Sequence, residues 1–472
     1  MSAGPGQPLF KTFRDPAGSL EIRPDGAYRF VRSPEDQELL AFLETPLAHT
    51  LVGQNRLVAS ALVPQEGTDA PPGSLLRHPR VAFPSYPWEW PPSLWLAAAE
   101  ATLNLCQDLV REGWILKDAT PLNVLFQGSQ PIFVDVLSVA RLDPGRPIWF
   151  AYAQFVRMFL LPMLTYARLG WPLRGTLSRR DGYEPEDVYP SLSLATRFTQ
   201  PALSTVTLPH LLSSRKPASA AAVHPAPADP ELTRHVLLKT LARLLKQMRR
   251  VTPAAGASTW TDYAETATHY VDQDHARKQT FVAGALDRIK PRSVLDIGCN
   301  TGVYSNLAAQ AGATVIAVDT DLQTVDLFAT RLRASAGQPG SHAARILPLW
   351  VDLANPTPAA GWDNLENSSF LQRATGHFDC VLMLAVIHHL LLHNQVPLDR
   401  IAALAGALTT RSLIMEWVPP ADPKFQELLR GRETLYAHLT EQAFRDAFGR
   451  LFFFESELAL DNGRILFHLQ RK

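Results

Sequence analysis

The chain has 472 residues, 46% of them hydrophobic and 19% charged, so it can bury sizeable cores and its length predicts two or three domains. Lysine plus arginine and aspartate plus glutamate number 45 each, which excludes a general electrostatic argument for binding nucleic acid or an anionic membrane. The three cysteines lie too far apart for a zinc motif or a disulfide framework. We therefore expect a cytoplasmic protein.

Two membrane signals are missing from the sequence. The N-terminus lacks the basic and then apolar run of a signal peptide. The longest apolar stretch, residues 149–169, is interrupted by Gln154, Arg157, Pro162 and Arg168. A buried helix pair explains this stretch better than a membrane span does, so we expect no membrane partner.

The first 130 residues alternate strand-like and helix-like patterns. Residues 20–23 and 28–31 flank Pro24-Asp25-Gly26, a typical hairpin turn, and residues 57–63 form another apolar strand candidate. A long helix with one apolar face is predicted from Pro91 to about Gly113. This half is therefore expected to be an α+β domain.

Three polar residues follow that helix. Asp118 and Asn123 are five residues apart, and Asp135 follows twelve residues later, after a short strand. Asp and Asn often bond the local backbone in turns, which is the simpler interpretation. The spacing also resembles the core of the protein-kinase and aminoglycoside-phosphotransferase superfamily, in which a loop Asp accepts a hydroxyl proton while an Asn and a second Asp hold metal.

The pattern departs from that superfamily. No glycine follows Asp135, no glycine-rich phosphate loop is visible, and Lys11 is the only lysine before Lys117. We therefore expect a degenerate kinase-like domain over residues 1–212 that serves as a scaffold or binding lobe. An ATP-dependent phosphotransferase is the alternative.

An alanine-, proline- and serine-rich stretch separates the two halves. Residues 213–232 have no periodicity and are predicted to be a linker. A helix with one leucine-rich face and many basic residues follows, and a solvated helix face explains its charge. The second domain is expected to span residues 233–472.

From about residue 255 the pattern alternates helices with apolar strands, which predicts a mostly parallel sheet. The strand candidates are residues 293–296, 314–319, 344–349, 380–384, 413–417, 451–454 and 465–469. The first is followed by the turn from Asp296 to Gly302, which opens a helix. A bare strand–turn–helix junction is the simplest interpretation of this turn.

The turn also resembles the first motif of class I S-adenosylmethionine-dependent methyltransferases. The resemblance implies a Rossmann-like seven-stranded domain that ends in an antiparallel hairpin. It implies that Gly298 and Gly302 let the backbone approach the methionine end of the cofactor and that Asp296 receives its ammonium group. Asn300 replaces the commoner middle glycine, and Asn tolerates left-handed backbone well.

The resemblance assigns further cofactor contacts after the next two strands. Asp319 ends the second strand, where a carboxylate accepts hydrogen bonds from the ribose hydroxyls. An NAD site would use the same device, but the G-x-G-x-x-G spacing is absent. Asp321 either assists or caps the following helix. Asp352 and Leu353 match the adenine contacts, although Asp352 also suits a turn.

Acceptor chemistry is expected after the fourth and fifth strands. His388 and His389 are candidates for a general base or a substrate-positioning group, with Glu416 orienting the base or binding the acceptor. Packing of one histidine and a metal site with Glu416 are the alternatives. Before the first strand, Tyr270 belongs to a lid-like segment, and Lys278 either pairs the methionine carboxylate or is a surface residue.

The arrangement as a whole is similar to a bacterial two-domain group that includes nodulation-type proteins of rhizobia. The resemblance implies methyl transfer to a small molecule, glycan or natural-product intermediate. The oligomeric state is not predicted. The expected cofactor-binding residues are Asp296, Gly298, Cys299, Asn300, Gly302, Tyr304, Asp319, Asp321, Asp352, Leu353, Ala385, Tyr270 and Lys278.

Overall fold

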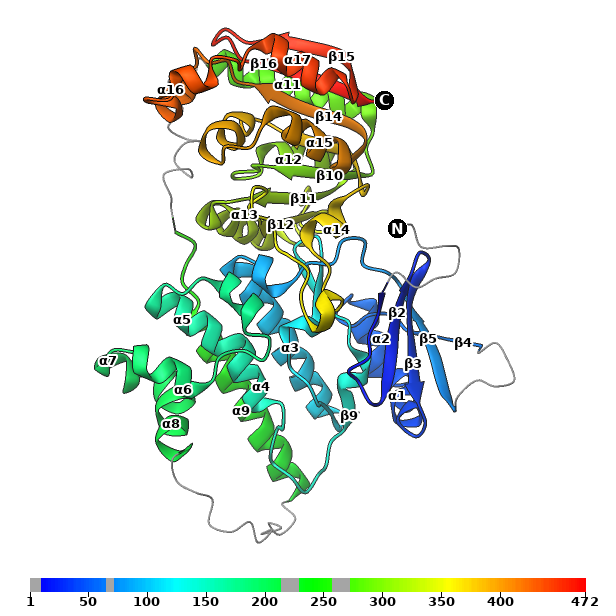
Figure 1. Ribbon diagram of the computed structural model, residues 1–472. Coiled ribbons are helices and arrows are strands. Elements are labelled where there is room, and N and C mark those ends of the chain that lie inside the picture. The colour runs from blue at the N-terminus through cyan, green and yellow to red at the C-terminus, as the bar shows by residue number, and fades with distance from the viewer. Residues whose placement is uncertain (1–9, 65–71, 214–228, 257–271) are drawn as a thin grey trace. The chain divides into compact units, whose positions relative to one another are not determined.

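The computed structural model describes residues 10–64, 72–213, 229–256 and 272–472 (Figure 1). The chain forms two compact units. Unit 1 comprises residues 1–126, 131–254 and 360–367, and unit 2 comprises residues 127–130, 255–359 and 368–472. In the described parts of the chain, no helix is both long enough and apolar enough to cross a membrane.

Unit 1 begins with an antiparallel sheet whose strand order is β1-β2-β3-β5-β4. Its strands are β1 (Phe10–Lys11), β2 (Gly18–Arg23), β3 (Gly26–Arg32), β4 (Ala61–Val63) and β5 (Gly73–His78). The predicted strand at residues 57–63 is therefore shorter, because Val58 donates its backbone N–H to the carbonyl of Phe133 instead of joining this sheet. The hairpin of β2 and β3 turns at Pro24 and Asp25, as predicted.

The rest of unit 1 is mainly helical. It contains a short antiparallel pair, β6 (Trp114–Leu116) with β9 (Val139–Arg141). A second short pair, β7 (Val124–Gln127) with β8 (Gln130–Phe133), turns through residues 127–130, which are grouped with unit 2. The α-helices of unit 1 are α1 (Glu35–Leu43), α2 (Pro46–Gly53), α3 (Pro92–Arg111), α4 (Tyr152–Phe155), α5 (Leu161–Leu169), α6 (Pro185–Val188), α7 (Leu194–Arg197), α8 (Leu208–Ser213) and α9 (Pro230–Val251).

Aromatic side chains form much of the unit 1 core. Trp95 of α3 makes edge contacts with Trp90 and with Phe159, and Trp90 makes another with Phe126. Helix α9 packs against α3 and α5 and belongs to unit 1, although the sequence predicts it to open the second domain. Its apolar face predicts that it packs on a core but does not indicate which one.

Unit 2 is built on a seven-stranded sheet with the order β12-β11-β10-β13-β14-β16-β15. The first five strands are parallel, and β16 is antiparallel to both of its neighbours, β14 and β15, so the predicted Rossmann-like fold with a closing hairpin is confirmed. The strands are β10 (Ser293–Ile297), β11 (Thr314–Asp319), β12 (Ile346–Trp350), β13 (Phe378–Met383), β14 (Thr409–Trp417), β15 (Phe452–Ala459) and β16 (Ile465–Arg471).

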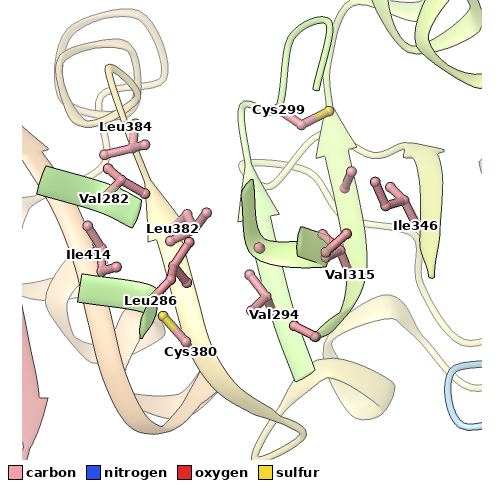
Figure 2. Close-up of a cluster of buried hydrophobic side chains, with 14 of the residues drawn as sticks. Val282, Leu286, Val294, Cys299, Val315, Ile346, Cys380, Leu382, Leu384 and Ile414 are labelled. Atoms are coloured by element: carbon pink, nitrogen blue, oxygen red, sulfur yellow. The ribbon is translucent and has the colours of Figure 1, made fainter. Parts of the chain in front are cut away.

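The helices of unit 2 precede the first of these strands or follow the strands along the chain. They are α11 (Asp272–Ile289), α12 (Val303–Gln310), α13 (Leu322–Ser335), α14 (Phe370–Ala374), α15 (Leu398–Leu408), α16 (Pro423–Leu429) and α17 (Glu441–Gly449). Figure 2 shows Val282 and Leu286 of α11 beside apolar residues of β13 and β14. This packing anchors α11 to the sheet.

The strand order determines where a ligand can bind. β10 pairs with β11 on one side and with β13 on the other, so the chain reverses its direction of winding at β10. Loops leaving such a strand separate and open a crevice at its carboxyl end, where doubly wound sheets bind their ligands. The turn from Asp296 to Gly302 lies at this end of β10.

Candidate active site

The turn after β10 has a left-handed backbone at three positions. Gly298, Asn300 and Gly302 have φ values of 73°, 48° and 85°, so Asn300 adopts the backbone for which Asn is suited. A Cβ on Gly302 would lie 2.0 Å from the ring of Phe328, and one on Gly298 would lie 2.5 Å from Val386. Both glycines are therefore required by neighbouring side chains as well as by their backbone conformation.

Asp319 connects the end of β11 to this turn. One carboxylate oxygen accepts the backbone N–H of Asn300 at 2.9 Å, and the other accepts that of Asp321 at 3.0 Å. Burial raises the pKa of Asp319, and these backbone hydrogen bonds oppose the shift. A carboxylate has about four lone-pair sites, so Asp319 retains acceptor capacity for ribose hydroxyls.

Asp321 has the capping role that was one of its two predicted roles. Its side chain accepts the backbone N–H of Thr324 at 3.0 Å and so caps α13. Asp352 likewise forms a turn, because its side chain accepts the backbone N–H of Ala354 at 2.8 Å. Leu353 beside it is buried. A turn role and an adenine contact are compatible for Asp352, and the adenine contact stays a prediction.

Asp296 lies beneath the turn and is buried. The hydroxyl of Ser305 donates to its carboxylate at 2.6 Å. Burial raises the pKa of Asp296 to about 6, and Ser305 opposes this shift. Cys299 beside it is buried as well, and burial raises the pKa of its thiol. A buried carboxylate lacking a direct cationic partner among the described residues is suited to a ligand ammonium group.

A chain of ion pairs lies at the carboxyl end of β14. Glu416 is 1% exposed; one of its carboxylate oxygens pairs with Lys278 of α11 and the other with Arg464 at 3.3 Å. Arg464 also pairs with Asp422 at 2.8 Å. We call these four residues the ion-pair chain. Its cations hold the pKa of Glu416 below its usual value despite burial.

The ion pair with Glu416 limits how Lys278 can contact a cofactor carboxylate. Lys278 is not a surface residue, because it pairs with Glu416 and its ammonium lies 5.3 Å from the ring centre of Tyr304. The Tyr304 hydroxyl is buried and lacks a hydrogen-bond partner among the described residues. Any contact of Lys278 with a cofactor carboxylate must therefore share its ammonium with Glu416.

His388 and His389 follow β13 and have adjacent rings, with centroids 4.2 Å apart. His388 is 2% exposed, and its Nδ1 has no hydrogen-bond partner within the described residues. Burial, followed by the neighbouring His389, lowers the pKa of His388 to about 3. Burial also lowers the pKa of His389. Burial therefore disfavours the protonated form of both imidazoles.

The residue that leads into this pair has an unusual backbone. Ala385 lies two residues after Met383, the last residue of β13, and has a φ of 56°, which a residue with a Cβ adopts at a cost of roughly 1 kcal/mol or more. Tyr270, the other predicted residue near the cofactor, lies outside the described residues. No group of three or more His, Cys, Asp or Glu side chains in the described ranges is placed to hold a metal ion.

Sequence reasoning missed Arg464 and Asp422. Arg464 stands just before β16 in the turn that follows Asp461 and Asn462, and Asp422 caps α16. Each is a common kind of residue in its local setting. The only available signal is that an arginine precedes an apolar strand whose partner, β14, ends in a glutamate.

Unit 1 also contains a polar cluster. The Asn123 amide donates to the Ser138 hydroxyl at 3.1 Å, and Ser138 donates to Asp135. Arg29 of β3 pairs with the other oxygen of Asp135 at 3.0 Å. Asn123 and Asp135, two of the three residues whose spacing resembles a kinase core, are thus linked through the Ser138 hydroxyl. Both carboxylate oxygens of Asp135 have protein partners.

Asp118 lies near this cluster. It accepts a hydrogen bond from the Gln154 amide at 3.3 Å, and burial raises its pKa, with the nearby Asp135 adding to the shift. A hydroxyl-proton acceptor at this position is therefore available. However, the two residues expected to hold metal have protein partners.

The sheet order, the left-handed turn after β10 and the carboxylates at the ends of β10 and β11 define a class I S-adenosylmethionine-dependent methyltransferase, whose cofactor is S-adenosylmethionine. A methyltransferase-domain family model matches residues 267–443. The nodulation protein NoeA of Rhizobium meliloti (strain 1021) is 30% identical over 454 residues, covering 92% of this chain and 90% of that protein. The chain belongs to the NoeA family.

Two solved structures are also similar to parts of the chain. One is magnesium protoporphyrin IX methyltransferase from Synechocystis PCC 6803 with bound SAM, at 18% identity and a TM-score of 0.30, covering 46% of this chain and 87% of that one. The other is the bifunctional kinase-methyltransferase WbdD, at 18% identity and a TM-score of 0.30, covering 44% of this chain and 41% of that one. At these scores neither likeness extends the assignment.

Proposed function

We propose that unit 2 transfers the methyl group of S-adenosylmethionine to a small-molecule acceptor, such as a glycan or natural-product intermediate. The observation that carries this proposal is the position of Asp319, which ends β11 and accepts the backbone N–H of Asn300 in the turn after β10. A carboxylate at this edge is suited to two ribose hydroxyls.

The other residues of the site have complementary roles in this proposal. Asp296 and the buried Tyr304 hydroxyl serve the methionine end of the cofactor, while Asp352 and Leu353 serve the adenine. The acceptor binds near His388 and the ion-pair chain. Glu416 cannot readily orient either histidine, since both of its oxygens pair with cations; it instead forms part of the acceptor wall.

The proposed methyl transfer requires mainly that the protein align the acceptor with the methyl group of the cofactor. The sulfonium is already an activated methyl donor, so the protein must hold the acceptor in line with the carbon–sulfur bond. Such alignment can lower a barrier by about 7–11 kcal/mol. The buried and rigidly paired side chains around His388 are suited to this task because they cannot easily change rotamer.

Calorimetric titration with S-adenosylhomocysteine tests the proposal. The full chain is expected to bind this product, and Asp319→Ala is expected to weaken binding greatly without unfolding the protein. Thr440→Ala, which removes only the cap of α17, is the matched control and is expected to keep its affinity. Equal affinity of Asp319→Ala and the unchanged protein would contradict the proposed site.

For unit 1 we propose a scaffold role rather than phosphoryl transfer. The ion pair of Asp135 with Arg29 supports it, because the guanidinium already balances the carboxylate charge and would repel a metal ion bound beside it. ATP with magnesium is then expected to leave the melting temperature unchanged. A rise that disappears in Asp135→Ala would favour the phosphotransferase instead.

We further propose that the domains follow the two compact units, with a boundary near residue 254.

A further inference from the structure

The ion-pair chain beside His388 is balanced in charge. Lys278 and Arg464 supply two cations, and Glu416 and Asp422 supply two anions; Glu416, Asp422 and Arg464 are at most 4% exposed. Each of these charges already has a partner of opposite sign. Burying a further charged group here would leave that group without a dedicated counter-ion, which is costly in a site of low dielectric.

Two buried hydrogen-bonding atoms near this chain lack a partner among the described residues: the Tyr304 hydroxyl, which the proposed function gives to the cofactor, and Nδ1 of His388. Its Nδ1 is buried and unpaired among the described residues, and the charges of Arg464, Asp422 and Glu416 all act on its ring. Buried polar atoms in native proteins are nearly always hydrogen-bonded. An unpaired Nδ1 at the carboxyl end of β13 therefore points to a ligand group.

The chemistry of Nδ1 restricts that group. A neutral imidazole nitrogen either accepts or donates, depending on the tautomer. A carboxylate or phosphate can only accept, and an ammonium can only donate. A hydroxyl does both, so it satisfies Nδ1 in either tautomer and brings no charge into the balanced site.

We propose that the acceptor of this methyltransferase presents an uncharged hydroxyl group to Nδ1 of His388, so that the product is a methyl ether. This inference rests on the proposed function and names its acceptor class. His388 then contacts the reacting atom. The ion-pair chain acts as a positioning group, because it forms a charge-neutral wall that excludes anionic and cationic acceptors.

The transfer step balances. The acceptor oxygen forms a bond to the methyl carbon while the carbon–sulfur bond breaks, and the electron pair of that bond stays on sulfur. The hydroxyl proton passes to Nδ1 of His388. The positive charge thus moves from the sulfonium to the imidazole. Burial, His389 and Arg464 lower the pKa of His388 to about 3, but the protonated ether oxygen formed by methyl transfer is a far stronger acid and gives up its proton to this nitrogen. The proton leaves to solvent after the products depart.

Nitrogen NMR of the full chain with labelled histidine and bound S-adenosylhomocysteine tests this inference without an identified acceptor. Methanol, formate and methylammonium are probes of similar size that differ in charge. Methanol is expected to shift the His388 Nδ1 resonance saturably, while the two ions cause little shift. His388→Gln assigns the signal, and His393→Gln, which changes a nearby exposed histidine, is the control expected to leave the response intact.

Two outcomes would overturn the proposal: formate or methylammonium shifting the resonance as much as methanol, or methanol failing to shift it. Calorimetry on the same sample measures S-adenosylhomocysteine binding independently. Loss of that binding would refute the proposed function, whereas retained binding with the wrong probe response would refute the hydroxyl assignment alone.

Discussion

Asp319 holds the backbone N–H of Asn300 at 2.9 Å, so the end of β11 fixes the turn that follows its neighbour β10. One carboxylate therefore shapes the turn and, in the proposed function, also faces the ribose. Asn300 adopts a left-handed backbone, so the chain leaves the extended conformation of β10 here. Its N–H donates to the side chain at the end of β11 and takes no part in the hydrogen bonds of the sheet.

The two tasks of Asp319 can be separated by substitution. Asp319→Asn keeps an oxygen that can accept the Asn300 N–H but loses the charge that strengthens hydrogen bonds from ribose hydroxyls. We expect a loss of about 1.5–3 kcal/mol in S-adenosylhomocysteine binding, roughly 10- to 150-fold. Asp319→Ala also frees the turn and is expected to lose more. Equal losses in the two variants by calorimetry would show that the turn contact contributes nothing.

Asp296→Asn is expected to stabilise the protein at neutral pH. The folded-state pKa of about 6 lies above the unfolded value near 3.8, so the folded protein holds the proton more tightly. Native stability therefore falls as pH rises through this window, and ionised Asp296 costs on the order of 1–3 kcal/mol above it.

Thermal melts at several pH values measure this effect. The advantage of Asp296→Asn should be largest above pH 6 and should shrink toward pH 4, while S-adenosylmethionine affinity falls. An advantage that is independent of pH would contradict the assigned ionisation. Ser305→Ala, which removes the 2.6 Å hydrogen bond to the carboxylate, should destabilise the protein most above pH 6.

Arg464→Met should be strongly destabilising. It leaves Asp422 without its buried ion partner and Glu416 with Lys278 alone, and breaking a buried pair costs about 3–5 kcal/mol. Arg450→Met is the matched control, because Arg450 pairs with Asp399 at an exposed site and such pairs contribute about 0–1 kcal/mol. Urea unfolding followed by a probe in unit 2 compares them; similar midpoints would show that the ion-pair chain is not stabilising.

Arg29→Met should weaken unit 1 by about 1.5–3 kcal/mol, the usual value of a hydrogen bond to a charged group, because Asp135 loses its partner at 3.0 Å. Arg77→Met provides the comparison, since Arg77 pairs with Asp25 in an exposed position. Scanning calorimetry that resolves the transition of unit 1 gives both values. A small effect of Arg29→Met would show that Asp135 is available to other partners.

Gly302→Ala and Gly312→Ala separate backbone strain from steric overlap. Both glycines have positive φ, at 85° and 97°, but only at Gly302 would a Cβ overlap Phe328; nothing lies within 4 Å at Gly312. Gly312→Ala is expected to cost about 1 kcal/mol of folding free energy, and Gly302→Ala an additional 1–3 kcal/mol from overpacking. Chemical denaturation measures both, and equal costs would remove Phe328 from the explanation.

The fold of unit 2 could be predicted because its information is local. Apolar strands alternate with helical patterns along the chain. The turn from Asp296 to Gly302 combines an acidic residue at a strand end with glycines at closely spaced positions, and few kinds of site need this combination. The left-handed backbone of Asn300 could likewise be anticipated from the residue type alone.

The ion-pair chain could not be predicted for the opposite reason. Lys278 and Glu416 are 138 residues apart, and Glu416 and Arg464 are 48 apart. Such pairs depend on sheet order and side-chain reach, which composition and periodicity do not encode. The same limit applies to Arg29 with Asp135 and to helix α9, whose leucine-rich face is compatible with either core.

The left-handed backbone of Ala385 restricts how this protein can vary. Glycine or asparagine at this position would relieve strain, whereas valine or isoleucine would clash with the backbone. A random library at position 385 should therefore return small or amide-bearing residues among its functional members. Because the two histidines follow within four residues, this bend fixes the backbone that presents them, and substitutions of their side chains disturb the local fold less than substitutions of Ala385 do.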